Sequence, residues 1–282
     1  MPILTTTVED PCPLISYSTT GWQQGRGESD PLITTSYSQS SFTASKTGDA
    51  SVSFSFNGTD IELFGSRRDN HGNYEVTIDN RTSSLNGFAQ PNLFKQSLFS
   101  ALNLTQGYHT ITLINKPTDN GHNFVDIDFI TWKSHIGEED DKLIIKAFQD
   151  TDPAFLYTPS DAWSANPDQI GLFNGGSGHQ ITGGASGSLT YTFSVRDGVQ
   201  LFGPIGPLGA PYFVQVDGGP VRSLTSAKDF YAAQMMLFHA DNLGDRKHVL
   251  QLEYRGSLNQ SFAIDYANVL STSSSNSGSQ SQ

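Results

Sequence analysis

Residues 63–79 read LFGSRRDNHGNYEVTID, and residues 201–217 read LFGPIGPLGAPYFVQVD. In both stretches a Tyr stands ten residues after the Phe, and apolar residues then recur at every second position up to an Asp. Alternation with a period of two is typical of a half-buried β-strand. Because the two stretches share this spacing, the sequence predicts one β-rich unit that occurs twice.

The similarity extends in the same order to both sides of these stretches. Upstream, Asp10 corresponds to Asp150, and downstream residues 127–129 (IDF) correspond to residues 264–266 (IDY). The offset between matching positions stays between 137 and 141 residues, which chance similarity would not maintain. We therefore expect two homologous domains.

The remaining segments set the expected domain boundaries. Residues 1–135 and 142–270 are predicted as the two domains, and the acidic residues 136–141, which lack apolar periodicity, as a linker between them. Residues 271–282 are rich in Ser and cannot bury enough apolar surface to become ordered. They are predicted as a disordered tail.

The apolar runs are short and are separated by turn-forming pairs such as Asn57-Gly58 and Asp217-Gly218. No segment of ten or more residues keeps a helical stripe. The sequence therefore predicts an all-β chain of two tandem antiparallel β-sandwich domains with roughly eight strands each, in the manner of jelly rolls.

Composition excludes several classes of function. Sixteen Lys and Arg stand against 28 Asp and Glu, a net charge of −12, so the chain would repel the phosphate backbone of a nucleic acid. No apolar stretch approaches the roughly 18 residues needed to cross a bilayer, and residues 1–10 lack a basic region followed by an apolar core. We expect neither nucleic acid binding nor membrane insertion. A single cysteine, Cys12, rules out an intrachain disulfide.

Four Asn-x-Ser/Thr sequons favour a secreted or cell-surface glycoprotein. They are Asn57, Asn80, Asn103 and Asn259.

Several motifs together resemble those of a known family. Residues 56–65 (FNGTDIELFG), 70–79 (NHGNYEVTID) and 125–130 (VDIDFI), with residues 202–207 (FGPIGP) and 212–219 (YFVQVDGG) of the second half, resemble the galactose-binding-like jelly-roll domains that basidiomycete fungi carry in tandem on secreted or membrane-anchored surface proteins. The resemblance covers about residues 8 to 270. It implies a galactose-binding-like jelly-roll fold and a carbohydrate-related role at the cell surface.

The densest polar cluster of the first half is the loop Arg67–Gly72. Sugars are bound by planar hydrogen-bonding groups beside an aromatic platform, and this loop supplies such polar groups. A solvated hairpin is the alternative. The predicted ligand-binding residues are Trp22, Arg67, Arg68, Asp69, Asn70, His71, Tyr74 and Phe88.

The matching loop of the second half, residues 204–211, has no charge and no side-chain donor, so we expect the two copies to be used differently. The weaker candidates there are Trp163, Tyr231, Gln234 and His239, for which packing is the alternative role.

Catalysis and metal binding are weaker hypotheses. A glycosidase needs two carboxylates across the scissile bond, and the best candidates are Glu75 and Asp69. The family resemblance implies a structural calcium ion between the first and last strands, and no other cofactor is expected. Its ligands would come from Glu9, Asp10 and Asp128, or from Asp150, Asp152 and Asp265, unless these carboxylates cap turns or bind backbone amides.

Three functions remain open at this point. The leading hypothesis is a non-catalytic, lectin-like protein that recognises a glycan or polysaccharide mainly through the polar loop of the first domain. The alternatives are a glycan-active enzyme, either a glycoside hydrolase or a lyase, and a structural cell-wall or adhesion module. The sequence does not fix the sugar or the oligomeric state.

Overall fold

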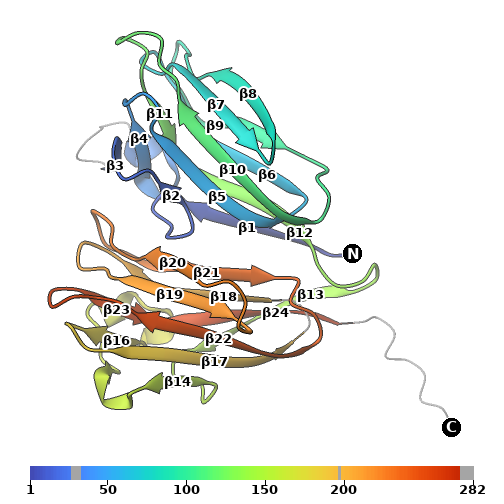
Figure 1. The fold of residues 1–282 in the computed structure, drawn as a ribbon, viewed down its shortest axis with the longest axis vertical. Helices are drawn as coiled ribbons and strands as arrows, with labels where there is room; N and C mark the ends of the chain where they lie inside the picture. Colours follow the sequence, from blue (N-terminus) through green and yellow to red (C-terminus); the bar gives the residue numbers. More distant parts are fainter. Residues whose placement is uncertain (27–32, 196–197, 274–282) are drawn as a thin grey trace. The chain divides into compact units, whose positions relative to one another are not determined.

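The computed structural model describes residues 1–26, 33–195 and 198–273 (Figure 1). The predicted all-β class is confirmed, because antiparallel sheets make up nearly all of the regular structure. The chain divides into two compact units. We call Leu4–His135 the first unit, and Met1–Ile3 together with the chain from Ile136 onward the second unit.

The first unit contains a four-stranded sheet in the order β1-β12-β6-β9, a five-stranded sheet in the order β2-β5-β10-β7-β8 and a three-stranded sheet in the order β11-β4-β3. Its strands are β1 (Ile3–Glu9), β2 (Ser16–Tyr17), β3 (Trp22–Arg26), β4 (Ser41–Ser45), β5 (Ser51–Gly58), β6 (Asp60–Arg67), β7 (Asn73–Ile78), β8 (Arg81–Asn86), β9 (Leu93–Ala101), β10 (Gly107–Asn115), β11 (Val125–Ile127) and β12 (Phe129–His135). A short helix, α1 (Ile33–Ser36), and a 3-10 turn, η1 (Ser38–Ser40), precede β4.

The second unit repeats this strand order with β13-β24-β18-β21, β14-β17-β22-β19-β20 and β15-β16-β23. Its strands are β13 (Lys142–Gln149), β14 (Phe155–Thr158), β15 (Trp163–Ser164), β16 (His179–Thr182), β17 (Gly187–Val195), β18 (Gly198–Ile205), β19 (Pro211–Val216), β20 (Arg222–Thr225), β21 (Ala232–Asp241), β22 (Arg246–Tyr254), β23 (Ser261–Ile264) and β24 (Tyr266–Ser273). Three 3-10 turns, η2 (Ser160–Ala162), η3 (Ile170–Leu172) and η4 (Asn174–Gly176), flank β15 and lead to β16.

The alternating apolar residues of the sequence form the core of each sandwich. In β5, Val52, Phe54 and Phe56 are buried, and β10 pairs with β5 so that Ile111 lies opposite Phe54. Trp132 on β12 packs against Phe54 from the four-stranded sheet. Each such side chain contributes about 1.5–3 kcal/mol when it leaves water, so these alternations are sufficient to hold two sheets together.

The described part of each unit has more than the roughly eight strands predicted, because the third sheet escaped sequence analysis. Its strands are short, and the hydroxyl groups of β4 face a buried carboxylate rather than an apolar core. On β4, Ser41 and Thr43 donate hydrogen bonds of 2.6 and 2.7 Å to the two carboxylate oxygens of Asp10. Because period-two hydrophobicity is absent here, the pattern did not indicate strands.

The segment predicted as a linker is partly built into the second unit. The Ile136 side chain is fully buried, and its backbone N–H donates to the carbonyl oxygen of Pro2. Asp141 closes a turn onto the carbonyl oxygen of Glu138, and β13 begins at Lys142. Of the predicted tail, residues 271–273 belong to β24, and residues 274–282 lie outside the described residues. None of the described helices is long and apolar enough to span a bilayer.

Asp10 is completely buried, and its environment disfavours the ionised form. Burial raises the pKa of its carboxyl to about 8, although the hydroxyl groups of Ser41 and Thr43 oppose the shift. An unfolded Asp titrates near pH 4, so between about pH 4 and 8 only the folded state holds this proton. The contribution of Asp10 to stability is therefore present below pH 4 and is lost as the pH rises through 8.

We expect Asp10→Asn to flatten the pH dependence of stability. The amide is neutral at every pH, so the unfolding temperature of the variant should fall less than that of the wild type between pH 5 and pH 8. Differential scanning calorimetry over this range measures the effect, with the exposed Asp140→Asn as the matched control. Parallel pH profiles for the wild type and Asp10→Asn would contradict the assignment.

Candidate functional site

A cavity of about 400 Å³ opens beside the three-stranded sheet of the first unit. Strands β3 and β4 form one wall, and the loop between β6 and β7 with the residues before β11 forms the other. Aromatic rings of Trp22, Phe42 and Phe124 line it together with polar side chains. These polar side chains are Gln23, Gln24, Lys46, Thr47, Arg68, Asn70, His71 and Asp126.

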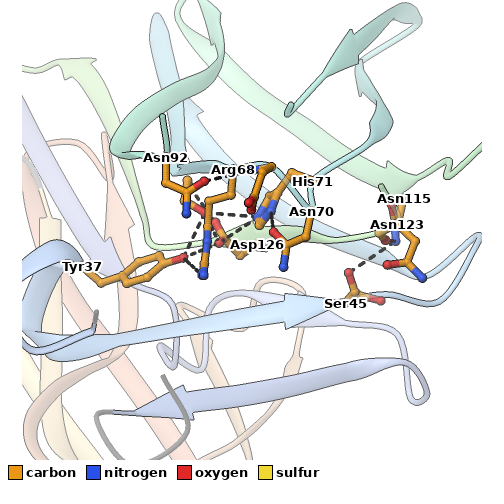
Figure 2. A network of polar contacts seen from close by, with 11 residues as sticks. Tyr37, Ser45, Arg68, Asn70, His71, Asn92, Asn115, Asn123 and Asp126 are labelled. Atoms are coloured by element: carbon orange, nitrogen blue, oxygen red, sulfur yellow. Dashed lines mark hydrogen bonds and ion pairs between the residues drawn. The ribbon is translucent and has the colours of Figure 1, made fainter. Parts of the chain in front are cut away.

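The carboxylate of Asp126, which is 1% exposed, is the centre of a polar network at this cavity (Figure 2). One oxygen accepts a hydrogen bond from the backbone N–H of Ser66 at 2.6 Å. The other accepts from the hydroxyl groups of Ser66 at 2.5 Å and of Tyr37 at 2.6 Å, and lies 3.1 Å from His71 Nε2. Arg68 reaches the same network, with Nη1 3.5 Å from the Tyr37 hydroxyl oxygen.

The network keeps Asp126 ionised despite its burial. Desolvation by itself would raise the pKa of Asp126, but the charge of His71 and the hydrogen bonds from His71, Ser66 and Tyr37 outweigh it and lower the pKa. Both ring nitrogens of His71 face oxygen atoms, Asp126 at Nε2 and Asn70 Oδ1 at 2.8 Å from Nδ1. Each ring nitrogen of His71 therefore has an oxygen atom within hydrogen-bonding distance. The same burial and the Asp126 charge raise the pKa of Tyr37, which therefore stays a donor.

Backbone contacts hold the β6–β7 loop in place. The N–H of Arg68 donates to the carbonyl oxygen of Gly87, and the N–H of Gly72 donates to that of Phe124. A Cβ at Gly72 would lie 1.9 Å from the carbonyl oxygen of His122, so only glycine fits this approach. The loop is thus a fixed part of the cavity wall.

Four of the eight residues predicted for ligand binding line the cavity: Trp22, Arg68, Asn70 and His71. The Trp22 indole N–H donates to the carbonyl oxygen of Ser51, which fixes the ring at the cavity wall.

The other four lie elsewhere. Arg67 donates to the carbonyl oxygen of Asn86 on β8, and Asp69 is an exposed residue of the turn whose N–H binds the Asn92 side chain. Tyr74 is a core residue whose hydroxyl donates to the carbonyl oxygen of Leu98.

Phe88 is 43% exposed and packs edge-on against His122. It therefore contributes no ring to the cavity lining.

Sequence reasoning missed Tyr37, Ser66 and Asp126. One signal could have found Asp126: in the repeat alignment Asp128 matches Asp265, whereas Asp126 matches Ala263. An ionisable residue that one copy has and the other lacks is a candidate for function rather than for fold. Tyr37 and Ser66 gave no such signal, since only the folded chain brings them to Asp126.

Ser66, His71 and Asp126 touch one another but do not form a catalytic triad. In a triad the serine and the aspartate bind opposite ring nitrogens of the histidine. Here Ser66 Oγ and Asp126 Oδ2 both lie 3.1 Å from the same nitrogen, Nε2, and Ser66 donates its proton to Asp126. Ser66 therefore has no base to activate it.

The predicted carboxylate pair is not assembled either. Asp69 points from an exposed turn, and Glu75 on β7 lies 3.5 Å from the Ser84 hydroxyl within the five-stranded sheet. Asp126 is the single carboxylate among the described residues that line the cavity. This cavity therefore lacks the pair of carboxylates that acid and base catalysis at a glycosidic bond needs.

The predicted calcium ligands of the first unit are mostly occupied by protein donors. Both oxygens of Asp10 bind hydroxyl groups, as described above. Glu9 Oε2 and Asp128 Oδ2 are buried with no partner among the described residues, and burial raises the pKa of Asp128 to about 7. Two free oxygen atoms fall short of the six to eight that calcium takes, so these residues do not fit the ion.

The second predicted calcium set is also occupied. Ser177 and His179 bind the two oxygens of Asp150, the backbone of Asn174 binds Asp265, and Asp152 caps the N–H of Ala154. Within residues 1–26, 33–195 and 198–273, no group of three or more His, Cys, Asp or Glu side chains is placed to hold a metal ion.

Backbone contacts identify the corresponding residues of the second unit. A Cβ at Gly65 would meet the carbonyl oxygen of Asp126, and a Cβ at Gly203 would meet that of Ala263. Matching bridges and hydrogen bonds of the backbone identify the other positions. The network residues Tyr37, Ser66, Arg68, His71 and Asp126 correspond to Phe173, Pro204, Gly206, Gly209 and Ala263. The second unit therefore keeps the fold and lacks every polar group of the network.

Of the residues predicted for the second copy, Tyr231 lines a cavity at the corresponding place. Trp163 is buried, Gln234 donates to the carbonyl oxygen of Leu172, and His239 is buried beside Asp241. These three do not line that cavity.

The four sequons differ in accessibility. Asn80, Asn103 and Asn259 are exposed, whereas Asn57 is half-buried and its side-chain oxygen accepts a hydrogen bond from Gln106.

Comparison with known proteins gives partial similarities. No protein-family model matches the chain. A stretch of 84 residues is 38% identical to the A type blood alpha-D-galactosamine galactosaminidase of Flavonifractor plautii, and it covers 29% of this chain and 8% of that protein. The chain thus corresponds to a small part of this curated relative.

Similar solved structures include a Paenibacillus xanthan lyase, 14% identical, with a TM-score of 0.36 over 96% of this chain and 27% of the lyase. The CBM36-1 domain of a multidomain xylanase from the hindgut metagenome of Trinervitermes trinervoides is 21% identical, with a TM-score of 0.30 over 48% of this chain and all of that domain. A carbohydrate-binding module CBM36 in complex with calcium and xylotriose is 18% identical, with a TM-score of 0.28 over 44% of this chain and 97% of the module.

We expect the Asp126 network to be strongly non-additive. Asp126→Ala leaves the Tyr37 hydroxyl and the His71 ring buried without the carboxylate that they contact, so it should lower the free energy of unfolding by about 3–5 kcal/mol. The double variant Asp126→Ala/Tyr37→Phe removes donor and acceptor together and should cost about 0.5–3 kcal/mol less than the sum of the single variants.

Urea denaturation of the full chain measures these differences, and Val76→Ala in the first-unit core is the control for a loss of packing. Its effect should add to that of Tyr37→Phe within about 0.5 kcal/mol. Strict additivity of Asp126→Ala and Tyr37→Phe would show that the carboxylate and the hydroxyl are not coupled.

Proposed function

We propose that the protein is a non-catalytic, lectin-like protein that binds a glycan or polysaccharide in the cavity of the first unit. The observation that carries the proposal is the Asp126 network itself. It is costly to bury, it faces a cavity, and the second unit forms the same fold without it.

The contrast between the units shows that the fold does not require the Asp126 network. A buried carboxylate and its donors are retained only where they stabilise the structure or serve a ligand. Since the second unit keeps the same strand order with Ala263 and Phe173 in place of Asp126 and Tyr37, stability of this fold does not need them. The contrast therefore supports service to a ligand as the role of the network.

The lining suits a sugar. A pyranose ring presents hydroxyl groups at its edge and C–H groups on its face, so it needs planar polar groups beside an aromatic surface. Arg68 and Asn70 supply planar polar groups held by the network, and Trp22 and Phe124 supply aromatic surface in the same cavity. The cationic side chains of Lys46 and Arg68 also attract electron-rich oxygen atoms to one point of a chain with a net charge of −12.

Two further points support a carbohydrate ligand at a cell surface. The curated relative is named for an activity on a galactosamine-containing blood-group sugar. Three of the four sequons are exposed, as glycosylation in a secreted protein requires. A secreted or cell-surface location is therefore part of the proposal.

A glycan array and a polysaccharide panel test the proposal on the full chain. The wild type should be retained on at least one glycan, and Arg68→Gln or Lys46→Gln should weaken binding about 10- to 100-fold, since a hydrogen bond to a charged group is lost. Arg67→Gln is the matched control, because the neighbouring arginine faces β8, and its affinity should stay within about twofold.

The same experiment separates the other functions. Equal retention of the Arg67 and Arg68 variants would overturn the assignment of the site. Release of soluble sugar from the panel would instead favour the glycan-active enzyme, and neither retention nor release would favour a structural wall or adhesion module.

A further inference from the structure

The second unit has a cavity of its own, of about 300 Å³, at the place that corresponds to the site of the first unit. It lies between the loop that joins β18 to β19 and the three-stranded sheet β15-β16-β23. The small residues that replace the network, Gly206, Gly209 and Ala263, do not fill the space that the polar groups occupy in the first unit. The second unit therefore has an open cavity where the first unit has the polar network.

One wall of this cavity is apolar. Pro204 and Ile205 come from the end of β18, Pro207 and Leu208 come from the loop, and Phe173 lines the same cavity. Leu208 is 59% exposed, so the apolar surface continues to the rim. An apolar wall that is open to water favours a ligand that brings an apolar group of its own.

The lining also holds an unsatisfied hydroxyl, on Tyr231, whose side chain packs beside Gly206 of the same loop. Tyr231 Oη is buried and has no hydrogen-bond partner among the described residues. A buried hydroxyl without a partner costs free energy, so Tyr231 fits a ligand that supplies an acceptor. Burial raises the pKa of Tyr231, which keeps its proton for donation. Asp168 and Gln180 line the cavity as well, and they bind each other.

The loop that forms the apolar wall is rigid, so the cavity does not close on itself. The N–H groups of Gly209 and Lys228 both donate to the carbonyl oxygen of Gly206. A Cβ at Gly209 would lie 2.2 Å from the carbonyl oxygen of Ser226, which shows how closely the loop is seated. Pro204 and Pro207 further restrict its backbone.

We propose that the second unit binds an N-acetylated sugar and recognises its acetamido group. The methyl group packs against the Ile205 and Pro207 wall, the carbonyl oxygen accepts from Tyr231, and the N–H donates to Asp168. The choice of a sugar as the carrier rests on the function proposed for the first unit, whereas the choice of the acetamido group rests on this cavity alone.

Isothermal titration calorimetry on the full chain tests this with four single sugars. N-acetylglucosamine and N-acetylgalactosamine should bind at least about tenfold more tightly than glucose and galactose. Tyr231→Phe should weaken binding of the acetylated sugars about tenfold while the unfolding temperature stays unchanged or rises, because the hydroxyl has no partner to lose. Ala263→Leu, which fills the cavity, should abolish binding.

Two controls make the outcome specific. Tyr108→Phe, at an exposed tyrosine of the first unit, should change nothing, and Arg68→Gln should leave binding of the acetylated sugars intact even if it abolishes retention on the glycan panel. Equal binding of acetylated and parent sugars, undetectable binding at millimolar sugar, or wild-type affinity of Tyr231→Phe would each overturn the inference. Loss of acetamido recognition in Arg68→Gln would place it in the first unit instead.

Discussion

The buried carboxylate of Asp126 is the interaction on which the candidate site depends. It draws donors from three separate segments, Tyr37 before β4, Ser66 on β6 and His71 in the β6–β7 loop. Each donor is held in place because the buried charge has lost its hydrating water and needs protein hydrogen bonds instead. The cavity wall that results is preorganised. Arg68 and Asn70 belong to it, and they are held by their contacts with Tyr37 and His71.

A second constraint explains why the network disappears as a whole in the second unit. If Asp126 alone became alanine, the Tyr37 hydroxyl and the His71 ring would remain buried without the carboxylate that they contact. A half-satisfied network is less favourable than none, so the replacements by phenylalanine, proline, glycine and alanine occur together. The two units thus share one fold, with a complete polar network at this position in the first unit and none in the second.

The two units share a buried aspartate that contacts the three-stranded sheet. In both, this aspartate follows the first strand. Asp10 binds Ser41 and Thr43 on β4, and Asp150 binds Ser177, just before β16, and His179 on β16. This contact ties the three-stranded sheet to the main sandwich. The sheet combines polar strands such as β4 with buried apolar residues of β11 and β23, such as Ile127 and Ile264. The candidate sites of both units are built on that sheet.

The sequence by itself determined the all-β class, because period-two alternations such as Val52, Phe54 and Phe56 can bury one face only as strands. It also indicated the β6–β7 loop and Trp22, because polar planar groups and an aromatic ring stood out from their surroundings. Only the tertiary structure decided that Arg68, in the β6–β7 loop, lines the cavity while Arg67, the last residue of β6, binds the backbone of β8. Only the tertiary structure, too, brought Tyr37, Ser66 and Asp126 together, because their contacts join residues 29 to 89 positions apart, and hydrogen bonds over such separations leave no periodic pattern in the chain.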